Sequence, residues 1–339
     1  MTAYTPYQAE VSQGTLQAMF EFQSLICELT GMDITNASMY DGATATAEAV
    51  LMASNATSRN EILMLDSVNP EYRKVVKTYC KHLPISIKII RAEQIAESLD
   101  ENTAAVVVQS PNYFGFFENF ESQITEIHEN KSLVIQIYDP ISLALFKTPG
   151  EMDVDIAIAE GQSLGNAMNF GGPLLGLFSC KKKLVRKMPG RLVGETVDTD
   201  GKRGFVLTLQ TREQHIRRER ATSNICTNQG LCALAATIHL ALAGKSGMRQ
   251  IAELCYNNAH QLAEKLTQFT GVSLISEQPF FKEFTISLPC DAEKIVEKMA
   301  KQGFLAGIAN GKNLTIAVTE KRTEKEMTEF VGYFEKLLV

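Results

Sequence analysis

The first regular pattern of hydrophobic positions predicts a helix over residues 12–30. Its apolar residues recur at helical spacing and would share one face; they are Leu16, Met19, Phe20, Leu25, Ile26 and Leu29. Gly31 follows as a typical C-terminal stop. A second, alanine-rich helix is expected to begin at Asp41 and Gly42, because an acidic residue followed by glycine suits a helix N-terminus.

Strand-like runs then alternate with helical stretches. The runs cover residues 61–65, 85–90, 104–108, 133–138 and 156–159. This alternation predicts a mostly parallel, doubly wound sheet with helices on its faces. Ligands on such sheets bind at the carboxyl ends of the strands, so the residues that follow these runs are the first place to look for chemistry.

The pattern changes in the last third of the chain. A long apolar helix over residues 225–243 is expected to link a large domain, residues 1–240, to a small α/β domain, residues 245–339. The small domain reads as αββαββα. Its expected elements are a helix at 248–269, strands at 272–276 and 284–288, a helix at 292–302, strands at 304–308 and 314–318, and a helix at 324–338.

Composition and charge exclude several classes of protein. The 339 residues are 45% hydrophobic and 21% charged, which suits a globular protein with a sizeable core. The net charge of -6 gives no reason to expect nucleic acid, which needs a concentrated basic face. No membrane segment is expected, because the longest apolar stretch, 231–243, is interrupted by Thr237 and His239 and is shorter than the roughly 20 residues of a spanning helix.

The seven cysteines are scattered and show no C-x-x-C spacing, so neither a disulfide framework nor a metal site is expected. Free thiols are typical of a reducing compartment, and the chain starts without a secretory signal pattern. A cytoplasmic location is the resulting expectation.

One loop carries the layout of a cofactor site without its central residue. The segment AEGQSLGNAMNFGGPLLG, residues 159–176, is similar to the loop that delivers a lysine to pyridoxal phosphate (PLP) in enzymes with a doubly wound sheet. Gln162 stands where the lysine belongs. An amide nitrogen is delocalised into its carbonyl and cannot form a Schiff base, so this chain is expected to lack the nucleophile.

Two further positions could belong to such a pocket. Asp139 follows the run 133–138 and could pair with a pyridine nitrogen, but an Asp-Pro pair is also an ordinary turn starter, and we favour the turn. Asp41 and Gly42 open a helix whose free amides could bind a phosphate. Plain helix capping explains the same residues, and the Asp41 carboxylate would repel an anion.

Basic residues form two clusters along the chain. The first, in the polar segment 210–220, is interpreted as part of a solvated linker, with the alternative that an arginine binds a partner or a carboxylate; it consists of Arg212, Arg217, Arg218 and Arg220. The second is expected to be a solvated strand end; it consists of Lys181, Lys182 and Lys183.

Three long segments resemble the alpha subunit (subunit 1) of glycine decarboxylases, the P-proteins of the glycine cleavage system. They are TPYQAEVSQG at 5–14, ICELTGMDITNASMYDG at 26–42 and REQHIRRERATSNICTNQ at 212–229. The resemblance covers essentially the whole chain and implies the type I PLP-enzyme fold. It also implies that the catalytic lysine belongs to a homologous partner subunit, eleven residues before a proline. Gln162 lies eleven residues before Pro173.

The resemblance further implies an activity and partners. The lysine-bearing beta subunit (subunit 2) would hold PLP and decarboxylate glycine, and the aminomethyl group would pass to the lipoylated H-protein. This chain would contribute structure and a wall of the site within a heterotetramer. Its vestigial pocket would comprise Gln162, Asp139, Asp41 and Gly42. The residues that could reach the partner's cofactor are Tyr4, Tyr7, Gln8, Asn224 and Asn228.

Family members carry a further segment ahead of the one that begins this chain, so the sequence is expected to be an N-terminally shortened version. Two other functions compete with the subunit. One is a stand-alone binding or regulatory protein that kept the fold and lost the chemistry. The other is an independent PLP enzyme that uses Lys147, whose place in a Lys-Thr-Pro-Gly turn argues against it.

Overall fold

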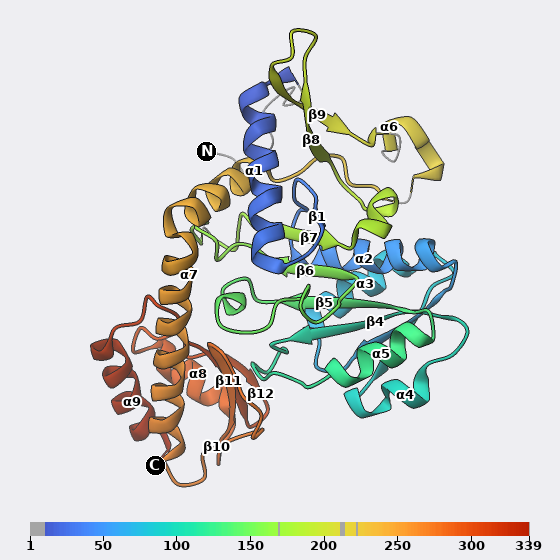
Figure 1. The fold of residues 1–339 in the computed structure, drawn as a ribbon. Coiled ribbons are helices and arrows are strands. Elements are labelled where there is room, and N and C mark those ends of the chain that lie inside the picture. Colours follow the sequence, from blue (N-terminus) through green and yellow to red (C-terminus); the bar gives the residue numbers. More distant parts are fainter. Residues whose placement is uncertain (1–10, 169, 211–213, 222, 339) are drawn as a thin grey trace. The chain divides into compact units, whose positions relative to one another are not determined.

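The computed structural model describes residues 11–168, 170–210, 214–221 and 223–338. The chain divides into two compact units with separate hydrophobic cores. Unit 1 consists of Met1–Gln109 and Asn119–Gly244, and unit 2 of Ser110–Glu118 and Lys245–Val339. Figure 1 shows the elements of each unit along the chain.

Unit 1 is built on a seven-stranded sheet in the order β1-β7-β6-β5-β4-β2-β3. Its strands are β1 (Ile34–Thr35), β2 (Glu61–Leu65), β3 (Ser86–Ile90), β4 (Thr103–Ser110), β5 (Leu133–Tyr138), β6 (Ile156–Glu160) and β7 (Gly176–Cys180). The pairs β2–β3, β2–β4 and β5–β6 are parallel. The expected mostly parallel sheet is therefore confirmed, although β7 runs antiparallel to both β6 and β1.

The helices of unit 1 are α1 (Gln13–Thr30), α2 (Gly42–Thr57), α3 (Pro70–Cys80), α4 (Ile95–Ser98), α5 (Glu121–Glu129), α6 (Gln214–Arg217) and the first part of α7 (Gly230–Thr267). Of these, α1, α2 and α5 pack against strands of the sheet (Figure 1). Every residue of β5 is buried, because a strand in the middle of such a sheet is covered on both faces. The expected helix starts near residues 12 and 42 are confirmed.

A two-stranded hairpin, β8 (Leu192–Val197) and β9 (Arg203–Thr208), was not predicted. Its position depends on α1, whose glutamines bond to its backbone. The Gln23 side chain accepts from Val193 N at 3.0 Å and donates to Val193 O at 3.0 Å. Gln13 makes the same pair of bonds to Phe205, at 2.8 and 2.9 Å. Polar hooks of this kind leave no trace in the hydrophobic pattern.

Helix α7 begins at Gly230, five residues later than expected, and leaves helical geometry at Gly244, where φ is 57° and ψ is -173°. This glycine ends unit 1. By length and composition alone the whole helix could cross a membrane, with a mean hydropathy of 1.3 in its most apolar window, of which 33% is buried. The break at Gly244 divides it, and its first part is shorter than a spanning helix.

Unit 2 contains an antiparallel sheet in the order β10-β11-β13-β12, with the second part of α7 and two further helices. The strands are β10 (Ser273–Leu274), β11 (Glu283–Ser287), β12 (Ile308–Asn310) and β13 (Asn313–Ala317), and the helices are α8 (Ala292–Ala300) and α9 (Glu324–Leu338). The order αββαββα matches the expectation. The third strand lies later than the predicted 304–308.

The segment Ser110–Glu118 belongs to unit 2, although the sequence analysis assigned it to the large domain. Its backbone bonds explain the difference. Phe117 N donates to Pro279 O at 2.8 Å, and Phe114 O accepts from the Thr285 hydroxyl at 2.9 Å. Gly115 is required at this contact, since a Cβ there would lie 2.1 Å from Glu283 O and its φ is +93°.

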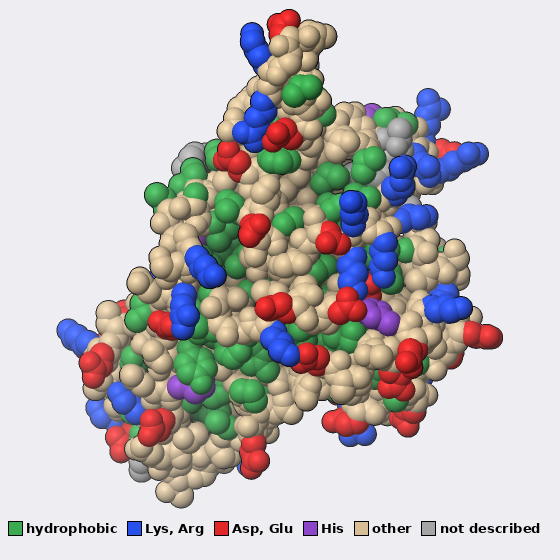
Figure 2. All heavy atoms as spheres, in the orientation of Figure 1, with side chains coloured by type: hydrophobic (Ala, Val, Ile, Leu, Met, Phe, Trp, Pro, Cys, Tyr) green, Lys and Arg blue, Asp and Glu red, His purple; other side chains and the backbone are tan. Residues whose placement is uncertain are grey.

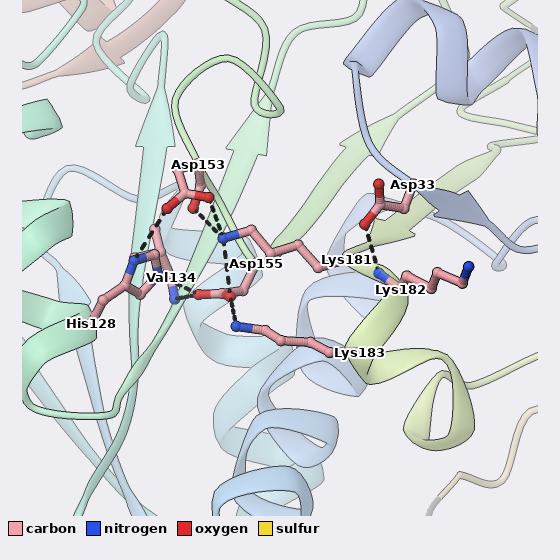
Figure 3. A network of polar contacts seen from close by, with 8 residues as sticks. All are labelled: Asp33, His128, Val134, Asp153, Asp155, Lys181, Lys182 and Lys183. Carbon is pink, nitrogen blue, oxygen red and sulfur yellow. Dashed lines mark hydrogen bonds and ion pairs between the residues drawn. The ribbon is translucent and has the colours of Figure 1, made fainter.

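A buried carboxylate connects α5 to the strands of unit 1 (Figure 3). Asp155 is fully buried, and its Oδ2 lies 2.7 Å from His128 Nε2 and accepts from Val134 N at 3.0 Å. Its Oδ1 lies 2.8 Å from Lys183 Nζ. Burial pushes the pKa of Asp155 up, but the hydrogen bonds from Lys183, Val134 and His128 and the charge of Lys181 together lower it below its ordinary value.

The lysine run after β7 is therefore not simply solvated, as the sequence analysis expected. Lys181 Nζ lies 2.6 Å from Asp153 Oδ1, and only 22% of its side chain is exposed. Lys182 contributes its backbone N–H, which donates to Asp33 Oδ2 at 2.8 Å (Figure 3). Two of the three charges pair with aspartates that precede β6, which a pattern of three lysines cannot reveal.

A second buried carboxylate lies on α2. Glu48 is 4% exposed, and its Oε2 has no hydrogen-bond partner among the described residues. Burial raises the pKa of Glu48 to about 7, against a hydrogen bond from Ser223. Below about pH 7 the native state therefore holds Glu48 mainly as the protonated carboxyl group.

Replacing Asp155 with asparagine should lower the free energy of unfolding by about 2 kcal/mol at neutral pH, because the buried charge that His128 and Lys183 surround is lost. The native pKa of Asp155 is lowered, so its contribution is present above the unfolded-state value and disappears as the pH falls below about 4. Urea unfolding of both proteins at several pH values measures the difference. Asp153→Asn, on a 70% exposed side chain, is the control and should change stability by less than about 0.5 kcal/mol.

Glu48→Gln should stabilise the protein by about 2 to 3 kcal/mol at about pH 8 and have little effect near about pH 4. The native pKa of about 7 lies above the unfolded value, so the stability that Glu48 contributes is fully present below the unfolded pKa and is lost as the pH rises through the native pKa. Thermal or urea unfolding across this range, with the exposed Glu101→Gln as control, tests the sign. Equal stabilities at alkaline pH would contradict the assignment.

Candidate functional site

The predicted pocket residues lie at the carboxyl edge of the unit 1 sheet. Strands β5 and β6 are parallel, and Tyr138 pairs with Ala159, so Asp139 and Glu160 come next along neighbouring strands. Strand β6 ends at Glu160, and Gln162 lies two residues further along the chain. Glu160 also bonds to Gly42 at the start of α2, which brings that helix end to the same edge.

Gln162 is turned into its own loop. Its side-chain Nε2 donates to Asn166 O at 2.6 Å, and its backbone N–H donates to Glu160 Oε1 at 2.9 Å. Asn166 in turn donates to Cys232 O at 3.3 Å, which ties the loop to the first part of α7. The side-chain amide of Gln162 thus forms a hydrogen bond within its own loop.

Glu160, which the sequence analysis did not single out, organises this edge. Its Oε2 accepts from Gly42 N at 3.0 Å, and its Oε1 accepts from Gln162 N at 2.9 Å and Leu175 N at 2.8 Å. One carboxylate therefore joins the α2 N-terminus to both ends of the 162–175 loop. Burial raises the pKa of Glu160, partly offset by the three N–H bonds, and the nearby Asp41 adds to the rise.

The chain packs closely around Gly42 at the α2 N-terminus. A Cβ on Gly42 would lie 2.3 Å from the Tyr72 hydroxyl and 3.0 Å from Glu160 N. Asp41 caps the helix in a capping box, with Oδ1 accepting from Thr44 N at 2.7 Å. The amides of Gly42 and Thr44 at this helix start thus donate to carboxylates of the chain itself.

Asp139 starts a turn. Its Oδ1 accepts from Ile141 N at 2.9 Å and from Ser142 N at 3.1 Å, an arrangement that an aspartate before a proline commonly adopts. Lys147 lies elsewhere, with Nζ 2.6 and 2.9 Å from the two oxygens of Glu121 and a 61% exposed side chain. An exposed, ion-paired lysine is a poor cofactor nucleophile, which argues against the independent-enzyme hypothesis.

These residues do not fit PLP in this chain. A Schiff base would need a lysine at this edge, but position 162 holds a glutamine whose side chain bonds to its own loop. A phosphate would require the α2 amides, but Glu160 accepts from Gly42 and Asp41 accepts from Thr44. A phosphate placed beside these two carboxylates would also be repelled.

The predicted partner-site residues fall into three groups. Tyr4, Tyr7 and Gln8 lie outside the described residues. Asn224 is exposed and accepts from the Gln214 side chain at 3.3 Å. Asn228 is 1% exposed, and its Nδ2 donates to Ala37 O at 2.8 Å, so little of its side chain is open to contact with a partner.

The arginine segment lies on the surface. Residues 214–220 are all exposed, and Figure 2 shows basic side chains gathered over α6 and the turn after it. Arg220 approaches Glu219 at 3.9 Å with both side chains largely exposed. The solvated interpretation therefore holds for Arg217, Arg218 and Arg220, whereas Arg212 lies outside the described residues.

Comparison with known proteins assigns this architecture. The family model described as "Glycine cleavage system P-protein" matches residues 1–334. The "probable glycine dehydrogenase (decarboxylating) subunit 1" of Moorella thermoacetica is 49% identical over 351 aligned positions, which cover 99% of this chain and 79% of the relative.

Solved structures agree. A crystal structure of glycine decarboxylase, the P-protein of the glycine cleavage system, in inhibitor-bound form superposes with a TM-score of 0.94 at 43% identity, covering 99% of this chain and 79% of that chain. C-DES, solved with glycine covalently linked to its PLP cofactor, is 14% identical with a TM-score of 0.70, covering 97% and 88%, and shows the shared fold alone. The chain has the type I fold of PLP enzymes and belongs to the glycine cleavage system P-protein family.

Proposed function

We propose that this chain is the non-catalytic subunit of a glycine dehydrogenase (decarboxylating) in the glycine cleavage system. In this assignment PLP and its lysine belong to a homologous partner subunit, which decarboxylates glycine and passes the aminomethyl group to a lipoylated H-protein. The chain acts in the cytoplasm and is inactive alone. The relatives' designation as subunit 1 supports the existence of a second subunit.

The observation that carries this proposal is the bonding of Glu160. A PLP-dependent subunit needs its helix N-terminus free for a phosphate and a lysine beside it. Here Glu160 accepts from Gly42 N, and Gln162 bonds to Asn166. The same edge of the sheet that would hold a cofactor is instead closed by internal hydrogen bonds. This supports a structural rather than a catalytic contribution.

The chain's role is then to present a stable surface to the partner. The loop between Gln162 and Leu175 is held at both ends by hydrogen bonds to Glu160. It carries the exposed apolar side chains of Met168 and Phe170, which are 85% and fully exposed. Apolar groups of this size on a pinned loop suit contact with another protein.

The first test is reconstitution. The chain, a lysine-bearing subunit 2 and lipoylated H-protein are mixed, and exchange of labelled bicarbonate into the glycine carboxyl group is followed. We expect exchange only when both subunits are present. Size-exclusion chromatography with light scattering should show one complex containing both.

Two controls separate the alternatives. Subunit 2 with H-protein alone should give little exchange, and this chain with H-protein alone should give none. If subunit 2 is fully active by itself and does not bind this chain, the subunit assignment is wrong and a stand-alone binding protein becomes the better description.

A second prediction concerns the closed pocket. Gln162→Lys should not produce the visible absorbance of protein-bound PLP after the cofactor is added and the excess removed, because Glu160 still occupies the Gly42 amide. Lysine-bearing subunit 2 treated in the same way is the positive control. Circular dichroism must show that the variant is folded. Visible absorbance, together with a pyridoxyl group that stays attached to residue 162 after borohydride reduction, would show that the pocket accepts the cofactor after all.

A further inference from the structure

A groove in unit 1 lies between one face of α3 and the edge strand β3, away from the Glu160 site in the strand order. Its volume is about 540 Å³. The helix contributes Pro70, Arg73, Lys74, Lys77, Cys80 and Lys81, and the loop and strand contribute Leu83, Ile85, Ile87 and Ile89. The site around Glu160 and Gln162 does not include any residue of this groove, and none of the hydrogen bonds described above lies in it.

The side of the groove formed by the strand is apolar. Residues 85, 87 and 89 share one face of the sheet because side chains alternate along a strand. All three are isoleucine, and none is fully buried; Ile89 is 45% exposed and Leu83 before it is also 45% exposed. These side chains form a continuous strip of partly exposed aliphatic surface, which we call the isoleucine strip.

The side formed by the helix is cationic. Positions 73, 74, 77 and 81 fall within about one third of the helical circumference, so their side chains project along one face. Lys74 pairs with Glu71 at 2.7 Å. No described residue forms an ion pair with Arg73, Lys77 or Lys81, although the chain as a whole carries a net charge of -6.

The backbone of β3 is open along its outer side. Ser86 N donates to Asn60 O, and Ile90 O accepts from Asp66 N, so the even-numbered residues direct their polar groups toward β2. In a parallel pair the N–H and C=O of the intervening residues point the other way. Ile87 and Ile89 therefore direct their polar groups outward, where no described residue pairs with them.

We propose that the α3–β3 groove binds an acidic, extended polypeptide segment of a partner protein, which pairs with β3 as an added strand. The free N–H and C=O groups of Ile87 and Ile89 supply the backbone pairing. Acidic side chains on alternate residues of the segment place their carboxylates next to Arg73, Lys77 and Lys81. The methylene groups of the same acidic side chains cover the isoleucine strip. Charge complementarity selects an acidic occupant, and the open edge selects an extended one.

The test uses defined peptides and the whole chain. A fluorescent eight-residue peptide with alternating Glu and Val is titrated at low salt and followed by anisotropy. A peptide of the same composition with four Val followed by four Glu, and an alternating Lys and Val peptide, are compared. We expect saturable binding of the first, at least about tenfold tighter than of either other peptide, and weaker binding as salt is raised.

Variants of the chain locate the site. Lys77→Glu with Lys81→Glu should weaken the alternating Glu and Val peptide at least about tenfold, which corresponds to about 1.4 kcal/mol. The matched control is Lys298→Glu with Lys301→Glu, an equal charge change on exposed residues at the end of α8, and should leave binding unchanged. Ile89→Pro, which removes one outward N–H, should also weaken binding while circular dichroism stays unchanged.

Several outcomes would overturn the proposal. The first is the absence of saturable binding. The second is equal affinity for the alternating Glu and Val peptide and for the peptide with four Val followed by four Glu. The third is an equal loss of affinity in the α3 and α8 charge variants. Binding of anionic lipid vesicles in place of the peptide would assign the groove to a membrane surface and would likewise reject a polypeptide ligand.

Discussion

The Glu160 carboxylate holds together the part of unit 1 where parallel strands and helices converge. It accepts from three backbone N–H groups: that of Gly42 at the start of α2, and those of Gln162 and Leu175 at the two ends of the loop after β6. A charged acceptor bonded to several donors is worth more than neutral pairs, and it satisfies amides that would otherwise be orphaned at this helix end. Burial opposes it by raising its pKa, so the arrangement depends on all three bonds.

The same contact matters because this fold is shared with PLP enzymes. In such folds a bound phosphate can satisfy a helix N-terminus, but Glu160 and Asp41 do so from within the chain. The Tyr72 hydroxyl, packed against Gly42, leaves no space at that position. These bonds are internal to unit 1, and they support the structural role proposed for this chain.

Polar residues position the outer elements of unit 1 in a comparable way. Gln13 and Gln23 hold the hairpin, and Asp155 holds α5 against the end of the sheet. These contacts are specific because a buried polar group without a partner is costly, so only one placement satisfies them. Along β3 the opposite holds, since its isoleucines are partly exposed beside the cationic face of α3, where no described residue forms an ion pair with Arg73, Lys77 or Lys81.

The sequence alone determined the alternation of strands and helices, the helix starts near residues 12 and 42 and the αββαββα order of the small unit, because these follow from periodicity and capping chemistry. It also singled out Gln162 at the expected lysine position, which stays a prediction, and favoured a turn at Asp139 over a cofactor contact. Only the tertiary structure decided that Asp139 starts a turn, that Asn228 is buried and that Ser110–Glu118 joins unit 2. Glu160 was missed because a glutamate at a strand end looks ordinary until distant amides converge on it. Contacts between segments far apart in sequence leave no local pattern to read.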